Sequence, residues 1–553
     1  MPDSRTPVPS PSEPVPPTES TIGAAVEAAA QRWPEACGWV FEDRRITFSE
    51  MRDLAARAAT GLHACGVRRG DVVALWTPNL AEWAVTAFAA YRLGAVVLSI
   101  NTRFKGFELT HLLSHSRAKV LIIQPQFLGI DFEELLEGVA PDLMLSPTGQ
   151  ATTASFPSLQ RLISVSPGRL SAMDWSALLD TAPADTTALD VDLTPDSPAL
   201  LQYTSGTTAA PKGALLNHRH LLNYAPETFS RLGVRAGDPV LNTQPVYHVG
   251  GASALTVPLV LGCTKVTPGH YDAGRVLELM ERERCVSRGG IPTMYLMEMA
   301  HPRFAEFDLS ALRSGWTGGP PAVMDQIRDG FGGLELIQLY GATEGGGTSG
   351  CITDPWEKRR VTAGRPMTGT ELRIIDPETG REVPAGEVGE ICIRGWNRMI
   401  GYFRDDERTQ EVVDAHGWLH MGDLGRFDEE GYLTYVGRLK DMIRVGGENT
   451  SAEEVEALLL EHPSVHQAAV IGVPDVRMGE VVLAIVERAA GSSLTAEEIV
   501  VHCKSRAANF RVPRHVRFVT DWPYTGSGKI AKKVLRDIYT PEFEITEQKV
   551  EVS

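Results

Sequence analysis

Short apolar runs that predict strands alternate in the first part of the chain with amphipathic runs that predict helices. The strand-like runs are residues 72–75, 95–100 and 119–123, and the helical ones are residues 81–93 and 106–115. This alternation is typical of βαβ units around a parallel sheet. A loop-rich stretch follows at 141–198, and then a second round with runs at 240–244, 252–261 and 334–339. The sequence therefore predicts two layered α/β subdomains.

The pattern changes in the last third of the chain. From about Gly364 to Gly437, short strands separated by turn residues predict a small β subdomain. The block after Gly437 predicts a smaller α+β domain, with elements at 452–460, 465–471 and 481–486 and a helix opened by Thr495. We expect an N-terminal domain at 21–437, a hinge at 438–441 and a mobile C-terminal domain at 442–553. Hinges of this kind gate many multistep enzymes.

Composition excludes several classes of protein. The 553 residues carry a net charge of −17, which argues against a nucleic-acid partner. The seven cysteines are scattered and never spaced C-x-x-C, which argues against a disulfide framework or a zinc site and favours a reducing cytoplasm. Residues 1–20 are rich in proline and lack an apolar core, so we expect a disordered tail and no signal peptide. The most apolar stretch, 83–100, is broken by Arg92 and Gly94, so we expect no membrane span.

One loop has the composition of a phosphate site. Residues 203–213, YTSGTTAAPKG, follow the apolar segment 198–202 and combine glycine, hydroxyl side chains and a lysine. Small residues let backbone N–H groups approach an anion, the hydroxyls add donors, and the lysine adds a point charge. Lys212 is followed by Gly213 and not by Ser or Thr, so the loop is no Walker A motif and a different ATP chemistry is implied.

This run resembles the pyrophosphate loop of adenylate-forming enzymes, which include acyl-CoA synthetases, luciferases and peptide-synthetase adenylation domains. The usual form is T-S-G-T-T-G-x-P-K-G. The resemblance implies that the matching residues bind the nucleotide, and these are Thr204, Ser205, Gly206, Thr207, Thr208 and Lys212. Ala209 stands where the usual form has Gly. The resemblance extends from about residue 47 to 537. It implies an acyl-CoA ligase that uses ATP and Mg²⁺ to convert a carboxylic acid into an acyl-AMP, and then uses CoA to form the thioester.

A second motif, YGATE at 340–344, ends a predicted strand. It offers an aromatic face, a hydroxyl and a carboxylate at the edge where α/β proteins bind ligands. The family's Y-G-x-T-E motif implies that Tyr340, beside Gly341, packs on adenine, that Thr343 contacts the α-phosphate region, and that Glu344 holds Mg²⁺. Upstream, the run at 316–320 resembles the family's adenine loop, so the backbone of Gly318, Gly319 and Pro320 is expected to contact the base.

Two runs are expected at the acyl group. Residues 245–251, PVYHVGG, match a motif whose aromatic or histidine residue lies beside the acyl pocket, which implies roles for His248, Val249 and Gly250. Gly345, Gly346 and Gly347 follow Glu344, where the family lines that pocket. Three glycines leave room for a wide acid, such as an aromatic or polycyclic one, or they form a turn that needs unusual backbone angles. We expect a hydrophobic acid, which is bulky only if the glycines leave that room.

The remaining motifs lie near the predicted hinge and beyond it. Residues 418–423 resemble W-x-H-T-G-D, in which the final carboxylate, here Asp423, accepts hydrogen bonds from both ribose hydroxyls, and Arg438 is expected to face the nucleotide. In the family the small domain swings about the position of Lys440. The resemblance places Gly446 and Gly447 along the pantetheine channel. Lys529, in a Gly-rich loop, is expected to bridge the carboxylate and the α-phosphate in the adenylating arrangement only.

The Ala209 departure leaves two functions open. An Ala in a left-handed conformation costs roughly 1 to 2 kcal/mol, and a Cβ that meets the pyrophosphate costs more. Only adenylation needs the β- and γ-phosphates, so the alternative is a ligase that thioesterifies an acyl-AMP made by a separate adenylating ligase. If residue 209 has a negative φ, the change is silent. An adenylation enzyme that loads a carrier protein, a luciferase-like oxygenase and a non-catalytic acyl-nucleotide binder are further rivals. A homo-oligomer stays open.

Overall fold

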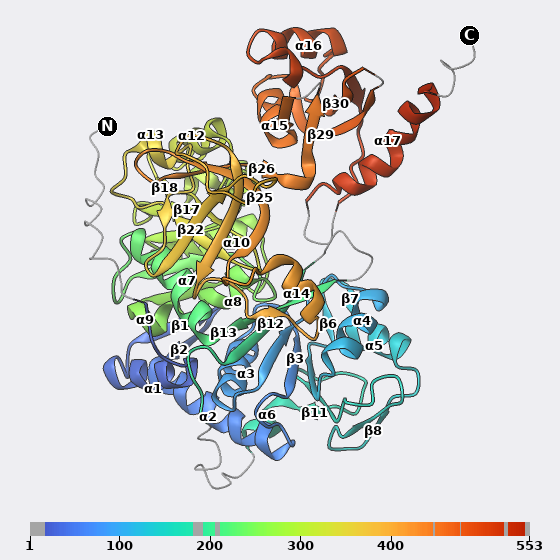
Figure 1. Cartoon of the computed structure of the whole chain (residues 1–553). Coiled ribbons are helices and arrows are strands. Elements are labelled where there is room, and N and C mark those ends of the chain that lie inside the picture. The colour runs from blue at the N-terminus through green and yellow to red at the C-terminus, as the bar shows by residue number, and fades with distance from the viewer. Residues whose placement is uncertain are drawn as a thin grey trace. The chain divides into compact units, whose positions relative to one another are not determined.

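The computed structural model describes residues 17–180, 192–204, 211–445, 448–475, 477–524 and 529–547 (Figure 1). The chain divides into two compact units. The first comprises the chain up to Leu372 together with Ile393–Leu419, and the second comprises Arg373–Cys392 and the chain from His420 onward. The β subdomain predicted at 364–437 is thus shared between the units. The predicted hinge at 438–441 concerns domain motion, and it stays a prediction.

An eight-stranded sheet in the first unit carries the predicted phosphate loop. Its strand order is β11-β10-β5-β3-β4-β12-β13-β24, with parallel pairing from β11 to β12 and antiparallel pairing of β13 with both neighbours. The strands are β3 Val72–Trp76, β4 Val96–Ser99, β5 Val120–Ile123, β10 Arg161–Ser164, β11 Met173–Asp174, β12 Pro198–Thr204, β13 Lys212–Asn217 and β24 Gly401–Tyr402. Strands β3, β4 and β5 are buried along their whole length, as expected for parallel strands covered on both faces.

The stretch predicted as loop-rich, 141–198, supplies two strands of this sheet, β10 and β11. Leu162 and Ile163 in β10 are fully buried. The prediction was wrong here because an apolar run of two residues is too short to separate from a loop by its pattern.

The second sheet of this unit has the order β18-β17-β16-β14-β15-β1-β2, and every pair is parallel except β1 with β2. Its strands are β1 Cys37–Phe41, β2 Arg44–Thr47, β14 Pro239–Asn242, β15 Thr264–Thr267, β16 Ser287–Gly289, β17 Ser314–Trp316 and β18 Glu335–Ile337. A small sheet beside it consists of β19 Leu339–Gly341, β20 Gly346–Ser349 and β21 Arg365–Pro366. Two short hairpins pair β6 Gln126–Phe127 with β7 Ile130–Asp131 and β8 Met144–Leu145 with β9 Ala151–Thr152.

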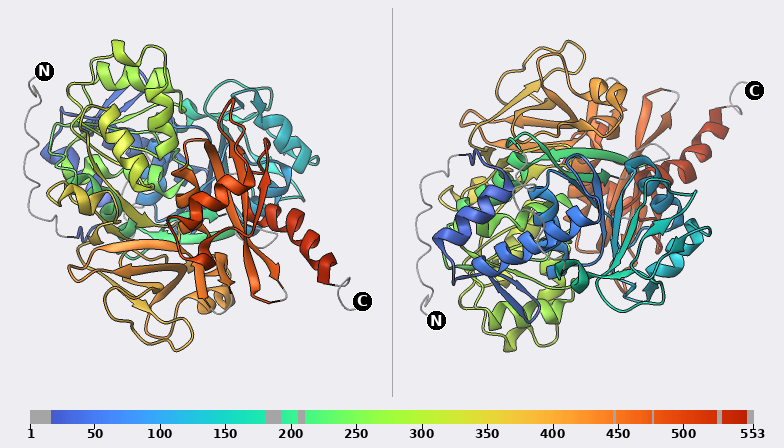
Figure 2. Two further views of the ribbon diagram at one scale, coloured as in Figure 1. Left: turned by 90° about the horizontal axis from the view of Figure 1, so that it is seen from above. Right: turned by 90° about the horizontal axis from the view of Figure 1, so that it is seen from below.

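Helices cover these sheets. They are α1 Ile22–Arg32, α2 Phe48–Ala64, α3 Ala81–Arg92, α4 Gly106–Ser116, α5 Phe132–Val139, α6 Trp175–Leu179, α7 His218–Arg231, α8 Val249–Ala254, α9 Val257–Leu261, α10 Ala273–Arg282, α11 Pro292–Met299, α12 Pro321–Gly330, α13 Trp356–Arg359 and α14 Asp406–Val412, with a short 3₁₀ turn at Phe304–Glu306. The blue helices α1, α2 and α3 lie side by side (Figure 2). Local chemistry fixes their starts. In α2, the Glu50 N–H donates to Thr47 Oγ1 at 3.1 Å and the Thr47 N–H donates to Glu50 Oε2 at 2.7 Å, which is a capping box.

Two further sheets follow, the first of which is shared between the units and the second of which lies in the second unit. One has the order β22-β23-β25-β26, formed by β22 Thr370–Ile375, β23 Gly389–Gly395, β25 Leu419–Phe427 and β26 Leu433–Arg438. The other contains β27 Met442–Val445, β28 Glu448–Ser451, β29 Val465–Asp475, β30 Gly479–Arg488 and β31 His515–Phe518. The helical elements are α15 Ala452–Leu460, α16 Ala496–Lys504 and α17 Lys532–Glu547, with 3₁₀ turns η3 Leu439–Asp441 and η4 Asn509–Arg511. The α+β prediction is confirmed, and Thr495 caps α16 as expected.

All seven cysteines are free thiols. Within the described ranges, none of the helices combines the length and the hydropathy that a bilayer crossing requires.

Lys265, in the interior strand β15, makes the stability of the first unit depend on pH. Its side chain is 1% exposed, and its Nζ donates to Thr267 Oγ1 at 2.6 Å. Burial lowers the pKa of Lys265 to about 7. Between about pH 7 and the unfolded pKa near 10.4, the unfolded chain binds more protons than the folded chain, so stability rises with pH across this window.

We therefore predict that Lys265→Met raises the melting temperature most at pH 7 and below, where the relief of charge burial is worth up to about 5 kcal/mol. The gain should shrink steadily between pH 7 and 10. Thermal unfolding of wild type and variant across this range checks the prediction, with the exposed Lys533→Met as control. A gain that is independent of pH would contradict it.

Candidate active site

The predicted phosphate loop joins the ends of β12 and β13. Thr204 and Lys212 are Cα partners and form the last pair of this antiparallel register. Because β12 runs parallel to β4, its carboxyl end lies at the edge where open α/β sheets bind ligands. Ser205, Gly206, Thr207, Thr208 and Ala209 lie outside the described residues, so the conformation at Ala209 stays untested.

Strands β12, β13 and β24 and the turn after β19 bring a carboxylate, two hydroxyls and a cation to the base of this hairpin. Thr204 Oγ1 donates to Glu344 Oε1 at 3.3 Å, and the hydroxyl of Tyr402, from β24, donates to the same oxygen at 3.2 Å. The Nζ of Lys212 lies 5.2 Å from the centre of the Tyr402 ring. Burial and the Glu344 carboxylate raise the pKa of the Tyr402 phenol, which therefore stays a donor. The sequence predicted Thr204, Lys212 and Glu344 for this site but missed Tyr402.

These oxygens suit the cation that the resemblance implies. Mg²⁺ prefers one or two carboxylates together with other oxygen ligands. Glu344 is half-buried and carries two hydroxyl groups on one carboxylate oxygen, which leaves its other oxygen as a ligand for a hard cation. The donor set therefore fits Mg²⁺.

The turn that carries Glu344 is held by its backbone. The Met399 N–H donates to the Glu344 carbonyl at 2.7 Å, and the Gly346 N–H donates to the Asn397 carbonyl at 3.2 Å. Within the turn, the Ala342 N–H donates to the Gly345 carbonyl at 2.6 Å. Residues 397–399, which no motif marked, thus position the carboxylate. Thr343 lies half-buried in the same turn.

Tyr224, in α7, occupies the space beside the glycines after Glu344. A Cβ on Gly346 would lie 2.5 Å from the Tyr224 ring, and a Cβ on Gly341 would overlap the Tyr224 hydroxyl. A Cβ on Gly347 would lie 2.8 Å from the side chain of Leu372. The expectation that these glycines leave room for a wide acyl group is therefore not supported at positions 346 and 347, where the chain's own side chains take the room. Close packing explains the glycines at positions 341, 346 and 347.

The predicted adenine loop is tied to the strand end that precedes Tyr340. The Gly319 N–H donates to Gln338 Oε1 at 3.1 Å, and the Thr317 N–H donates to the Ile337 carbonyl at 3.1 Å. Tyr340 itself is 7% exposed. A Cβ on Gly318 would lie in ordinary contact with Gln338 Oε1 at 3.9 Å, and Pro320 caps α12. The structure thus brings Gly318, Gly319 and Tyr340 onto adjoining strand ends.

Three buried polar side chains hold the predicted acyl-pocket run at 245–250. The Val246 N–H donates to Asn79 Oδ1 at 2.8 Å, Ser99 Oγ donates to the Val246 carbonyl at 3.2 Å, and the Gln202 amide donates to the Tyr247 carbonyl. His248 then caps α8, the helix that begins at Val249. A Cβ on Gly250 would overlap the side chain of Gln244, so this glycine is required by close approach. Side chains from β4, from β12 and from the segment between β3 and α3 thus hold the backbone of this run.

Two histidines of α4 hold the outer side of the hairpin. His111 Nε2 donates to the Pro211 carbonyl at 2.9 Å, and His115 Nδ1 is 2.7 Å from the Tyr203 hydroxyl. The two rings stack with centres 5.4 Å apart. Burial and the neighbouring His111 lower the pKa of His115, which favours its neutral form. The sequence analysis missed this pair, although two histidines four residues apart on a predicted helix were a visible signal.

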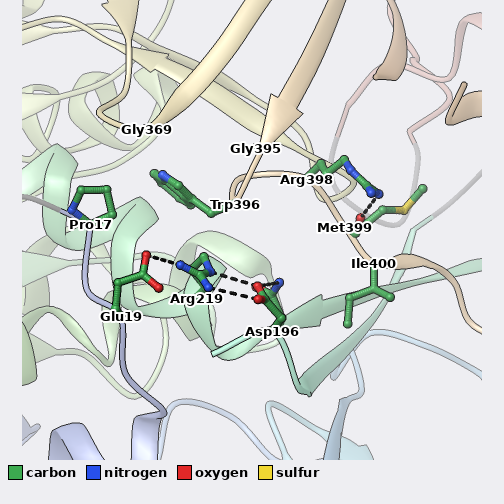
Figure 3. Close-up of a pocket in the computed structure, with 11 residues that line it drawn as sticks. Pro17, Glu19, Asp196, Arg219, Gly369, Gly395, Trp396, Arg398, Met399 and Ile400 are labelled. Atoms are coloured by element: carbon green, nitrogen blue, oxygen red, sulfur yellow. Dashed lines mark hydrogen bonds and ion pairs between the residues drawn. The ribbon is translucent and has the colours of Figure 1, made fainter. Parts of the chain in front are cut away.

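Another pocket of about 500 Å³ lies behind residues 395–400 and contains none of the predicted site residues. In Figure 3, Arg219 lies between the carboxylates of Asp196 and Glu19, with Trp396 and Arg398 on the opposite wall. Arg219 contacts Asp196 through two hydrogen bonds of 2.9 and 3.0 Å, so its charge is already neutralised. This pocket therefore lies apart from the predicted nucleotide ligands.

The predicted ribose ligand lies in the second unit. Asp423 and Arg438 are Cα partners on β25 and β26, and Arg438 Nε lies 2.9 Å from Asp423 Oδ1. The Asp423 side chain is 5% exposed. Lys440 lies in η3, next to Asp441, whose Oδ1 is 2.7 Å from Arg536 Nη2. These contacts place Arg438 and Asp423 together, and their proposed contacts with the ribose and the nucleotide stay predictions.

Two predicted groups remain untested. Lys529 is exposed at the end of its loop, and Gly446 and Gly447 lie outside the described residues. Their proposed contacts with nucleotide and CoA stay predictions.

Comparison with known proteins decides the family. Residues 26–403 match the family described as AMP-binding enzyme, and residues 454–529 match the family described as AMP-binding enzyme C-terminal domain. The chain belongs to the AMP-binding enzyme family. Within it, the mitochondrial medium-chain acyl-CoA ligase ACSF2 of Danio rerio is 34% identical over 541 residues, which cover 94% of this chain and 88% of the relative.

Solved structures of AMP-binding enzymes support the same family assignment. The anthranilate CoA ligase AuaEII, in complex with anthranoyl-AMP, has a TM-score of 0.82 at 28% identity and covers 95% of this chain and 98% of its own. A fatty acyl CoA synthetase of Mycobacterium tuberculosis has a TM-score of 0.71 at 30% identity and covers 94% of this chain and 99% of its own. The chain is an AMP-forming acid–thiol ligase that makes acyl-CoA through an acyl-adenylate, and it uses CoA together with ATP or the acyl-AMP. The family, fold class and enzyme class predicted from the sequence are confirmed.

The His111 contact gives a prediction for this AMP-binding enzyme. Removing one hydrogen bond worth about 1 kcal/mol from the hairpin should raise the KM for ATP in adenylation about fivefold in His111→Ala. His111→Gln, whose amide also donates, should recover part of the loss. Thioester formation from supplied acyl-AMP should be unchanged, because it uses no β- or γ-phosphate. The exposed His416→Ala is the control, and an equal loss in both half-reactions would contradict a role in the hairpin.

Proposed function

We propose that this ligase converts a hydrophobic carboxylic acid to its CoA thioester with both half-reactions in one chain. The observation that supports this most is the Thr204–Glu344–Tyr402 cluster beside Lys212 at the base of the hairpin. It combines a hard-cation ligand with a phosphate-binding cation at the carboxyl end of β12.

The proposal gives each half-reaction its residues. In the first, an oxygen of the acid attacks the α-phosphorus of ATP and pyrophosphate leaves, with Lys212, Thr343 and Lys529 stabilising the negative charges. Glu344 would hold Mg²⁺, which supplies charge neutralisation on the phosphates. In the second, the CoA sulfur attacks the acyl carbon, the thiol proton is lost and AMP leaves. Tyr340 and residues 318–320 would hold adenine, Asp423 and Arg438 the ribose side, and Gly446 and Gly447 the pantetheine arm, after movement about Lys440.

The acid is proposed to be hydrophobic, with its chain beside His248, Val249 and Gly250. The names of similar proteins mention medium-chain acids, anthranilate and fatty acids, which are all largely apolar. Tyr224 fills the space next to Gly346, so the structure favours a narrower acid than the three glycines suggested. Medium-chain and single-ring aromatic acids are the first substrates to assay.

Glu344→Gln tests the cluster. The amide oxygen still accepts hydrogen bonds from Thr204 and Tyr402, so the fold should survive, but the negative charge for Mg²⁺ is lost. We predict a loss of about 100-fold in acid-dependent exchange of pyrophosphate into ATP, a magnitude of the kind seen when one electrostatic stabiliser is removed. The exposed Glu357→Gln should keep full exchange. Exchange at the wild-type rate in Glu344→Gln would remove the proposed role.

A second candidate function rests on Ala209, which stands where the usual loop has Gly. If its Cβ obstructs pyrophosphate, wild type should show little exchange yet form acyl-CoA from supplied acyl-AMP. Ala209→Gly should then raise exchange about tenfold, the equivalent of the 1 to 2 kcal/mol cost of a left-handed Ala. Strong exchange by wild type, unchanged in Ala209→Gly, would eliminate this candidate. Competition between CoA and a holo carrier protein for the acyl-AMP tests the carrier-protein alternative.

A further inference from the structure

Three side chains with metal-binding atoms converge on one face of the sheet β22-β23-β25-β26. Glu390 and Cys392 alternate with apolar residues on β23, so both point to the same face, and His420 lies on the neighbouring strand β25. One carboxylate oxygen, the thiol sulfur and an imidazole nitrogen all lie within 4.8 Å of one another. This cluster is separate from the residues proposed to bind ATP or CoA.

The spacing of these atoms approaches that of a metal site. Zn²⁺ binds sulfur at about 2.3 Å and nitrogen at about 2.0 Å, so a tetrahedral site separates sulfur and nitrogen by about 3.5 Å. The Cys392 Sγ to His420 Nδ1 distance is 3.6 Å. Glu390 Oε2 lies 2.9 Å from the same nitrogen, and it needs to withdraw by only about 0.5 Å to complete three ligands.

The surroundings hold these side chains in place. The Gly422 N–H donates to Glu390 Oε1 at 3.1 Å, which fixes the carboxylate and leaves Oε2 pointed at the cluster. A hydrogen bond of this kind to a ligand carboxylate is typical of metal sites. Cys392 is fully buried, whereas the His420 side chain is 30% exposed and offers a path for an ion and a solvent ligand.

We propose that Glu390, Cys392 and His420 form a site for a thiophilic divalent ion of the Zn²⁺ class, with a water molecule as fourth ligand. On binding, the thiol loses its proton to solvent, and the imidazole, which binds through Nδ1, keeps its single proton on Nε2. The thiolate selects against Mg²⁺, which prefers oxygen ligands. The absence of a C-x-x-C spacing argues against a zinc site whose ligands lie in one segment of the sequence. It does not apply here, because the three ligands come from two strands.

Metal binding at this site is expected to affect Asp423, the residue proposed to bind the ribose of the nucleotide. Gly422 precedes Asp423, and its N–H is held by the same carboxylate that would bind the ion. Withdrawal of Glu390 from His420 therefore acts on the backbone next to the proposed ribose ligand. Occupancy of the site should change the affinity for ATP without blocking the nucleotide site directly.

Titration of the metal-free full-length protein with Co²⁺ tests the proposal, because a cobalt–thiolate bond gives a charge-transfer absorption band. We expect the band to saturate at one equivalent, to be displaced by Zn²⁺ and to be unaffected by millimolar Mg²⁺. Cys392→Ser should abolish the band and weaken Zn²⁺ binding at least about 100-fold, whereas the control Cys351→Ser should keep both.

Two further variants keep the test independent of folding. Glu390→Gln and His420→Gln each remove one ligand and leave the thiol, and each should weaken Zn²⁺ binding while circular dichroism stays unchanged. No cobalt–thiolate band in wild type, or a band of equal strength in Cys392→Ser, would overturn the proposal and leave the three side chains as a hydrogen-bonded structural cluster.

Discussion

The antiparallel pairing of β12 with β13 is the constraint on which the candidate site depends. β12 is fixed from one side by β4 and from the other by β13, which brings Thr204 and Lys212 side by side at the start of the phosphate hairpin. β13 in turn pairs with β24, and this pairing carries Tyr402 to the same place. Two residues before β24, Met399 holds the carbonyl of Glu344. One continuous series of backbone hydrogen bonds thus positions the hydroxyls, the cation and the carboxylate, although they come from three distant segments. Side chains that pack on this frame, such as His111 and Tyr224, refine the position of a site that the backbone has already built.

Much of the fold could be predicted because many elements combine a clear periodicity with a capping residue. The helix expected at 452–460 is α15, Ala452–Leu460, and the helix expected after Thr495 is α16, which has a complete capping box. The strand expected at 72–75 is β3, since a fully buried parallel strand is a continuous apolar run. Among the site residues, Thr204, Lys212 and Glu344 could be grouped because each lies in a motif with an unusual mixture of glycine, hydroxyl and charge. The structure does bring these three together.

The remainder depends on contacts between segments, which local patterns do not encode. Tyr402 and Met399 lie in stretches with no motif, and only the β13–β24 pairing gives them a role. A glycine is ambiguous in a sequence, because an open space and a close approach both require the absence of a side chain. Tyr224 resolves this for Gly341 and Gly346 in favour of close approach. The grouping of Glu390, Cys392 and His420 could not be predicted, because residues that are neighbours across two strands have no fixed separation in the sequence. The edge strand β11 and its neighbour β10 were missed because their apolar runs are short.

Transfer of isotope from the acid to the nucleotide tests the central claim, that one chain forms an acyl-AMP and then an acyl-CoA. A medium-chain or aromatic acid labelled with ¹⁸O in its carboxylate is incubated with ATP, Mg²⁺, CoA and the purified protein. The masses of AMP, pyrophosphate and acyl-CoA are then measured by mass spectrometry. Attack of a carboxylate oxygen on the α-phosphorus, followed by cleavage at the acyl carbon, leaves that oxygen in AMP. The account predicts one labelled oxygen in each AMP formed, none in pyrophosphate, and one acyl-CoA for each AMP. Acyl-CoA formation with the label in pyrophosphate or phosphate, or no AMP formed with any acid unless acyl-AMP is supplied, would contradict it.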